Sequence, residues 1–352
     1  MPFKEHIDKT LKLDPTPTPI FKMILSALSM IVPLLVGYIF NHQFVSMIAA
    51  LMGLLLYLND HFGVLSARLK HLLATYLFMG LGFSVGAFCA GNNYLIVSIL
   101  FISSFMIGKS KDYGVELEKV MLFVTLQFLT ASSDVIFLQE LRELVVYCNL
   151  AFINYIFWAI VIYQISKHQV SPSSSKRAAI KKIMTHNKGL KFPLVCAVFA
   201  CTGFLAAQSL KFSHPYWIVG TYLIVILPDS YQSIYKSSQR LIGTIIGVVI
   251  SSVILTFVQD ARVLLGFVVI FSFLLPHGIS KNYWVGNVYI AALILIFLEL
   301  GVPNSTTVHH LGFWRIVDIA IGSAIGVFAA IWIRPELIKD LISPFRKKTK
   351  SL

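Results

Sequence analysis

A few charged residues interrupt the long apolar stretches of this chain, and these are the residues that could do chemistry. In the second half, Asp229 is followed by Lys236 and Arg240, and Arg315 is followed three residues later by Asp318. An arginine at a helix start suits a carboxylate ligand, because the helix dipole and the free N–H groups there also favour anions. A carboxylate inside an apolar helix suits a proton relay. The combination predicts a site that binds or translocates an anion.

Each of these charges also has a purely structural interpretation. Arg240, which the pattern places at a helix start after a polar loop from Asp229, could anchor that helix at the membrane interface. Arg315 and Asp318, at i and i+3, share a helix face and could form an intrahelical ion pair one turn into the helix. Asp229 could pair with Arg240, bind a proton that drives export, or serve as a polar helix end.

The first half of the chain carries a partial copy of this pattern. Asp60 and Arg68 end one predicted helix and open the next, and Arg68 precedes Arg240 by 172 residues (240 − 68). Arg142 precedes Arg315 by 173 residues (315 − 142), but valines follow it where an acid would be needed. The spacing indicates an internal duplication with unequal halves. Duplicated halves commonly enclose a translocation path near the membrane midplane.

Aromatic residues flank the predicted helices. Tyr216 and Trp217 follow a proline at a helix start, where aromatic rings commonly form an interfacial belt. A second interpretation is that one of them stacks on an aromatic substrate. Gly108 and Lys109 lack the earlier glycine of a phosphate-binding loop, and the histidines and cysteines lack metal-ligand spacing. We therefore expect no metal, no cofactor, no nucleotide hydrolysis and no enzyme.

Composition places these residues in a membrane. Hydrophobic residues make up 57% of the 352 residues and charged residues only 13%, whereas a soluble domain carries about 25% charged residues. The polar first 20 residues lack the apolar core of a cleaved signal peptide. The net charge of +13 is assigned to membrane topology and lipid contact, so no nucleic-acid partner is expected.

The apolar stretches predict an all-α integral membrane protein of about twelve transmembrane helices, arranged as two parallel six-helix repeats. A spanning helix needs about 20 residues. The second and fourth predicted helices of each half are shorter, which predicts broken or re-entrant helices there. The predicted helices cover residues 21–40, 44–58, 68–90, 93–108, 117–137, 141–166, 191–210, 214–228, 239–258, 261–276, 282–300 and 311–333.

The positive charges predict the orientation of these helices. With a cytoplasmic N-terminus, only Arg142, Lys211, Arg262 and Arg315 of the 29 Lys and Arg lie outside, which leaves 25 (29 − 4) inside. The predicted domains are a cytoplasmic segment, a first membrane half, a basic cytoplasmic linker, a second membrane half and a basic cytoplasmic tail. Their bounds are 1–20, 21–166, 167–190, 191–335 and 336–352.

The second half resembles the fusaric acid resistance (FUSC) family of the aromatic acid exporter superfamily. The resemblance rests on Arg240-Leu-Ile-Gly243-Thr244-Ile-Ile-Gly247, on Arg315-Ile-Val-Asp318-Ile-Ala-Ile-Gly322, and on the closing Arg334-Pro335. It is specific over about 214–335 and weak over 21–166, where Asp60 and Arg68 lack the Gly-Thr element. The large cytoplasmic domain of many members has no counterpart in the linker or the tail, so the chain resembles a minimal member.

The resemblance implies a bacterial inner-membrane transporter that exports small organic anions, aromatic carboxylates among them, with proton coupling as the energy source. A passive organic-anion channel and a non-transporting protein of membrane assembly or envelope maintenance are the alternatives. The partners expected are the organic anion and membrane lipid, with a homo-oligomer and a periplasmic adaptor left open. Function is expected first around Asp229 to Gly247, with the first half as a degenerate wall.

Overall fold

The regular structure of the described residues is entirely helical. The computed structural model describes residues 10–61, 63–133, 141–166, 189–212, 214–301 and 308–337. Most of the predicted N-terminal segment, linker and tail lies outside the described residues. The helices are α2 (Ile20–Ile39), α3 (Gln43–Asn59), α4 (Leu65–Cys89), α5 (Asn93–Ser110), α6 (Val115–Ser133), α7 (Leu141–Ile165), α9 (Lys191–Ser209), α10 (Pro215–Val225), α11 (Ser230–Phe257), α12 (Ala261–Lys281), α13 (Tyr283–Gly301) and α14 (Val308–Ile333).

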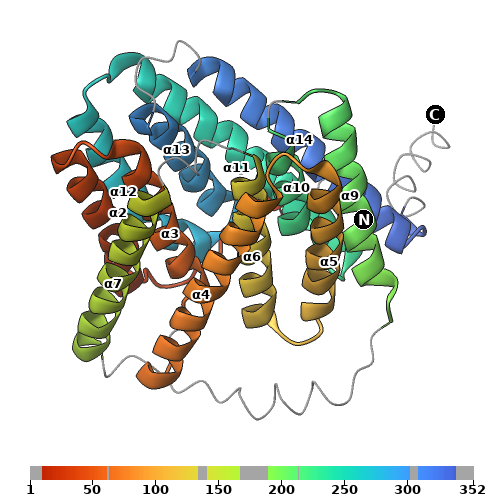
Figure 1. Cartoon of the computed structure of the whole chain (residues 1–352), viewed down its shortest axis with the longest axis horizontal. Coiled ribbons are helices and arrows are strands. Elements are labelled where there is room, and N and C mark those ends of the chain that lie inside the picture. Colours follow the sequence, from red (N-terminus) through yellow and green to blue (C-terminus); the bar gives the residue numbers. More distant parts are fainter. Residues whose placement is uncertain are drawn as a thin grey trace.

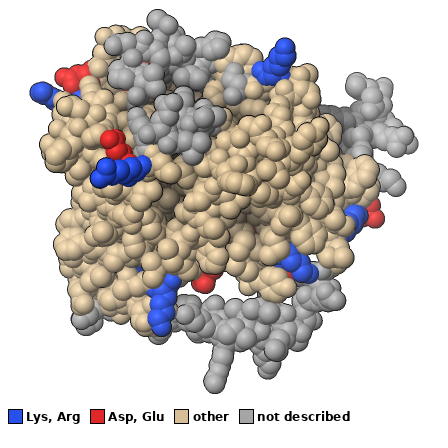
Figure 2. Space-filling model, in the orientation of Figure 1, with Lys and Arg blue, Asp and Glu red and all other residues tan. Residues whose placement is uncertain are grey.

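These helices have the composition of membrane spans. Within the described part of the chain, nine of them are long and apolar enough to cross a membrane. Large apolar side chains are exposed along them, such as Phe88, Phe257 and Trp332. Figure 2 shows one face on which charged side chains are few and lie mostly toward the edges. An apolar surface of this extent needs lipid around it, so the chain is a multi-pass membrane protein.

Of the helices that the sequence predicts to be short, the second of each half is short in the structure and the fourth is not. The second helices, α3 and α10, have 17 and 11 residues. The fourth helices, α5 and α12, have 18 and 21 residues and are long enough to span. The prediction of a break in the fourth helices is therefore wrong. α12 continues through Pro276 and His277, which read as a helix end in sequence, because neighbouring helices allow a proline inside a membrane helix.

The connection between α10 and α11 differs most from the prediction. The polar stretch from Asp229 to Gln239 reads as a loop, but α11 begins at Ser230 and runs for 28 residues. Ser233 and Ser237 point into protein and are buried, so this stretch needs no water to solvate it. Arg240 consequently lies eleven residues into the helix (240 − 230 + 1) and does not open it.

Each half contributes the same packing pairs. α2 packs on α3, α3 on α7, and α4 on α6. The corresponding pairs of the second half are α9 with α10, α10 with α14, and α11 with α13. Between the halves, α2 packs on α12 and α5 packs on α9, so the first helix of each half contacts the fourth helix of the other. In Figure 1, α10 lies near the centre, between α9, α11 and α14.

Glycines set how closely the third helix of the second half approaches its neighbour. A Cβ built on Gly243 would lie 2.3 Å from the carbonyl oxygen of Trp284, and one on Gly247 would lie 2.4 Å from that of Val288. A side chain would push α13 away from α11. The glycines are therefore required for the backbones to touch.

The first half uses the same arrangement. Cβ atoms built on Gly82 and Gly86 would lie 2.5 Å and 2.2 Å from the carbonyl oxygens of Val124 and Phe128, which joins α4 to α6. Close packing through glycines four residues apart therefore occurs in both halves. On α14, a Cβ built on Gly322 would lie 2.5 Å from the carbonyl oxygen of Ile218 on α10, and one on Gly326 would lie 2.6 Å from the Val225 side chain.

Two lysines donate hydrogen bonds to carbonyl groups at the C-terminal ends of the short helices. Lys119 donates from Nζ to the carbonyl oxygen of Leu58 at 3.1 Å, near the end of α3. Lys111, in the turn between α5 and α6, donates to the carbonyl oxygen of Ile226 just after α10 and also pairs with Glu118 at 3.4 Å. Burial lowers the pKa of Lys111, and Glu118 opposes that shift. The α5–α6 hairpin thus caps one short helix in each half.

Contacts between distant segments agree with alternating helices. Gln208 donates to Asn93 at 2.8 Å, Lys191 donates to the carbonyl oxygen of Ile333 at 2.9 Å, and Lys281 donates to that of Thr16 at 2.8 Å. Each of these contacts joins helix ends that the predicted topology places on one side of the membrane. Which side is cytoplasmic stays a prediction.

The glycine contact between α11 and α13 gives the first testable prediction. Gly247→Val should lower the free energy of unfolding by about 1–3 kcal/mol, because the added side chain meets backbone that cannot move aside. The measurement is the unfolding midpoint of the purified protein in detergent. Gly266→Val on α12 is the matched control, since nothing lies within 4 Å of its Cβ position. Equal midpoints for the two variants would show that this close approach is unimportant.

Candidate functional site

Arg240 anchors a buried polar cluster between α11, α13 and α14. Its side chain is 7% exposed, and Nη1 donates to Tyr283 Oη at 3.1 Å and to Asn287 Oδ1 at 3.0 Å. Lys236 lies one helical turn earlier, with Nζ 5.4 Å from the centre of the Tyr283 ring. Tyr283 and Asn287 share one face of α13 because they are four residues apart. Two positive charges therefore converge on this face.

Arg315 and Asp318 complete the polar cluster from α14. Both are buried, at 6% and 1% exposure. The Arg315 guanidinium lies over the ring of Trp217 on α10, with 4.3 Å from its carbon to the ring centre. It is also near enough to Arg240 for the two positive charges to repel, and near enough to Asp318 for attraction. We call Lys236, Arg240, Tyr283, Asn287, Arg315 and Asp318 the polar cluster.

The ion pair predicted within α14 is not formed. Arg315 and Asp318 do not come within 4 Å of each other among the described ion pairs, because Arg315 turns toward Trp217 instead. Asp318 is also deeper than predicted, since α14 begins at Val308 and Asp318 lies in its third turn. Charges at such depth are expensive, at roughly 2.5–3.5 kcal/mol each near a helix centre, and mark functional sites by default.

Several atoms of the polar cluster have no hydrogen-bond partner within the protein. They are buried Nε atoms of Arg240 and Arg315, one carboxylate oxygen of Asp318, and the Asn287 amide nitrogen. A buried ionic group without a partner is unfavourable, so water or a bound solute must complete these contacts. The free N–H groups belong to arginines and an amide, which suits an anion.

The first half contains a buried group of charged residues in which the charges are paired. The Arg68 guanidinium and the Asp60 carboxylate form a buried ion pair, with Nε donating to Oδ1 at 2.8 Å and Nη2 contacting Oδ2. Tyr155 on α7 donates to the same carboxylate at 2.7 Å. Of the roles considered for the aspartate at the end of a second helix, ion pairing with the next arginine is the one that Asp60 has. Because these partners satisfy the carboxylate, this pair holds α3, α4 and α7 together.

The second half does not repeat that pair. Asp229 is exposed and caps α11 by accepting from the Tyr231 N–H at 3.0 Å; no ion pair joins it to Arg240 among the described residues. The glycine contacts explain the difference. When the third helices of the two halves are aligned by these contacts, Gly82 corresponds to Gly243, an offset of 161 residues (243 − 82). The offset between Arg68 and Arg240 is 172 residues. In this register Arg240 lies 11 residues (172 − 161), or about three helical turns, further along its helix than Arg68 does.

The structure brings most of the predicted site residues together. Arg240, Lys236, Arg315 and Asp318 meet in the polar cluster, Trp217 borders it, and the Tyr216 ring contacts the Trp217 ring edge-on. His214 stacks on the Trp217 ring at 4.2 Å between ring centres. The pair of Asp60 and Arg68 and the capping residue Asp229 lie elsewhere.

Sequence reasoning did not identify Asn287, Tyr155 or Tyr283 as residues of the buried polar groups. Asn287 is an amide in an otherwise apolar helix, four residues after Tyr283, and this spacing is a usable signal for a shared polar face. Tyr155 is fully buried in the middle of α7. Its partner Asp60 is 95 residues away in sequence, so no local pattern reveals the contact.

Fold and site together define a multi-pass membrane protein with a buried cationic cluster in its second half. In a comparison of the sequence with known families, the family model described as "Fusaric acid resistance protein-like" matches residues 200–329. The matched residues include Trp217, Arg240, Asn287, Arg315 and Asp318, so the resemblance expected from the motifs is confirmed for this part of the chain.

Curated relatives agree with this result. The chain is 28% identical over 136 residues to inner membrane protein YccS of Escherichia coli, which is 39% of this chain and 18% of the relative. It is 27% identical over 164 residues to the uncharacterized membrane protein YvaC of Bacillus subtilis, 44% of this chain and 25% of the relative. The matched part is thus a quarter or less of each relative's length. No solved structure matches the chain significantly.

The buried pair in the first half gives the second prediction. Arg68→Gln should lower the free energy of unfolding by about 3–5 kcal/mol, because it leaves the Asp60 carboxylate buried without its cation. Thermal unfolding in detergent is the measurement. Lys70→Gln is the matched control, since Lys70 is an exposed cation on the same helix. A loss no larger than that of the control would contradict a structural role for the pair.

Proposed function

We propose that this protein is a transporter that exports small organic anions, aromatic carboxylates among them, through a path that passes the polar cluster. The observation that supports this most is the set of unpartnered N–H groups on Arg240, Arg315 and Asn287. They face a region with three cations, Lys236 included, and one carboxylate. Such a site attracts one anionic group and stays cationic until the anion arrives.

The aromatic neighbours support an aromatic substrate class. Trp217 lies under the Arg315 guanidinium, and His214 stacks on the same indole. In the proposed complex a flat substrate ring packs against the edge of this indole while its carboxylate contacts the arginines. Tyr216, Lys236 and Trp217 are the residues we assign to the walls of the path, with Arg240 and Arg315 as the anion ligands.

Asp318 is the residue we propose for proton coupling. Its carboxylate is buried, has one oxygen without a partner, and lies near Arg315 without forming an ion pair. A proton on Asp318 would remove the negative charge that competes with an anion for Arg315. Binding of a proton and release or capture of the anion would then be linked through one guanidinium.

The remaining features extend the proposal. The recurrence of the same packing pairs supports two parallel repeats, each with one short second helix. We place the protein in a bacterial inner membrane with both termini cytoplasmic, in line with the E. coli relative described as an inner membrane protein. Asp60 and Arg68 belong to the wall of the first half, and Asp229 positions α11. A homo-oligomer and a periplasmic adaptor are compatible with this arrangement.

Transport in proteoliposomes tests the proposal. We expect labelled phthalate, an aromatic dicarboxylate that crosses bare bilayers slowly, to accumulate when a proton gradient is imposed. Arg240→Gln should reduce the rate by about tenfold or more, because a buried ligand charge is lost. Arg262→Gln, which changes an exposed arginine at the start of α12, should leave it unchanged.

Asp318→Asn separates coupling from binding. This variant should lose accumulation against a gradient but keep exchange of internal for external phthalate, because the anion site is intact and only the proton site is gone. Passive current without a proton gradient, unaffected by Asp318→Asn, would make the protein a channel. Rates that equal those of protein-free vesicles, and that no variant alters, would favour a non-transporting role.

A further inference from the structure

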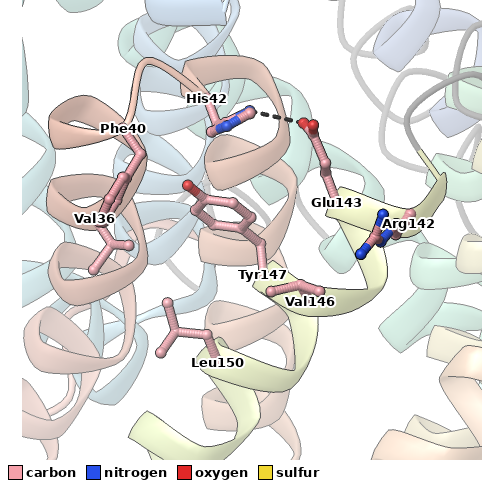
Figure 3. A pocket seen from close by; sticks show the side chains of 8 residues that line it. All are labelled: Val36, Phe40, His42, Arg142, Glu143, Val146, Tyr147 and Leu150. Atoms are coloured by element: carbon pink, nitrogen blue, oxygen red, sulfur yellow. Dashed lines mark ion pairs between the residues drawn. The ribbon is translucent and has the colours of Figure 1, made fainter.

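A separate cavity opens at the end of the first half, away from the polar cluster. It has a volume of about 410 Å³ and lies between the end of α2, the start of α3 and the first turns of α7 (Figure 3). Its rim carries an ion pair between His42 Nδ1 and Glu143 Oε2 at 2.7 Å, and Arg142 follows on the same rim. The transport site does not use any of these residues.

Polarity changes along the depth of this cavity. The charged rim lies at helix ends, since His42 precedes α3 and Arg142 is the second residue of α7. Val36 and Leu150 form the floor, and each lies farther from the nearby end of its helix than the rim residues do. The cavity therefore runs from charged to apolar in the direction from the helix ends toward the middle of the helices, which is also the polarity gradient of a phospholipid.

The surroundings of the cavity face lipid. Phe40 is 64% exposed and Val146 is 60% exposed, and both line the cavity. Exposed apolar side chains of a membrane protein at this position contact acyl chains. A lipid can therefore enter from the side without leaving the bilayer, whereas a soluble ligand would have to displace lipid.

The charged residues of the rim also restrict which lipid headgroups can bind. Arg142 offers a guanidinium to a phosphate, and Glu143 offers a carboxylate to an ammonium. The side chains of His42 and Glu143 are 40% and 46% exposed, so a ligand can reach both. A purely anionic headgroup would meet the Glu143 charge, and a quaternary ammonium has no N–H to donate to it.

We propose that this cavity binds one phospholipid with a phosphoethanolamine headgroup. Arg142 contacts the phosphate, Glu143 accepts from the primary ammonium, and an acyl chain lies along Val36 and Leu150. The proposal is independent of the transport function, because it concerns a different face of the chain.

Among the described residues of the second half, an indole lies at the position that corresponds to this cavity. His214 precedes α10 as His42 precedes α3, but its ring stacks on Trp217 at 4.2 Å between ring centres. The Arg315 guanidinium lies over the same indole, where Arg142 faces a cavity in the first half. The indole occupies the space, so we expect one such lipid per chain.

Native mass spectrometry of the full chain tests the proposal. The purified protein is mixed in detergent with equal amounts of phosphatidylethanolamine, phosphatidylglycerol and phosphatidylcholine. The wild-type protein should retain one phosphatidylethanolamine in preference to the others by about tenfold, the effect of one good charge contact. Arg142→Gln should lose this bound lipid, and Arg262→Gln, a second exposed arginine on another helix, should keep it.

Glu143→Gln provides the sharper result. It should bind phosphatidylglycerol as well as phosphatidylethanolamine, since the ammonium partner is gone while the phosphate partner remains. Unchanged lipid retention in Arg142→Gln, or an unchanged preference in Glu143→Gln, would overturn the proposal, provided that unfolding midpoints match the wild type. Equal competition by soluble phosphoethanolamine would also overturn it, because the site would then not require a lipid.

Discussion

An ionised side chain kept away from water needs partners, and this requirement organises the membrane part of the chain. In the first half the Asp60 carboxylate pairs with the Arg68 guanidinium and accepts a hydrogen bond from Tyr155. The two charges therefore neutralise each other. In the second half Arg240 and Arg315 share a region with one carboxylate that pairs with neither. A satisfied pair is a structural element, and an unsatisfied one calls for a solute. The same physical rule therefore assigns different roles to the two halves.

Close backbone packing provides the frame in which this difference arises. The third and fifth helices of each half touch through glycines, with carbonyl oxygens about where a Cβ would be. That contact fixes the register of each helix pair and leaves the charged positions to vary around it. Arg240 and Arg68 consequently lie at different depths on equivalent helices. The packing pairs that recur in the two halves form similar scaffolds, and the polar cluster lies in the second half.

The short second helix of each half ends early and is followed by non-helical backbone. α10 ends after 11 residues and leaves carbonyl groups without helical partners. Lys111 reaches from the first half to one of these carbonyls, and Lys119 does the same at the end of α3. A membrane protein can keep such a break only where protein or water satisfies the backbone. The α5–α6 hairpin meets this need in both halves and ties the two together.

The sequence alone determined the helices and their apolar surfaces, because hydrophobic length is a local property that the bilayer selects directly. It also identified most charged residues of the polar cluster, since a charge in an apolar helix stands out. It misplaced the start of α11, because polar residues that face buried protein look like a loop. Only the tertiary structure decided which charges meet: Arg315 turns to Trp217 and away from Asp318, and Asp60 finds Tyr155 across 95 residues. Those contacts depend on helix register and rotation, which close packing sets and local sequence does not record.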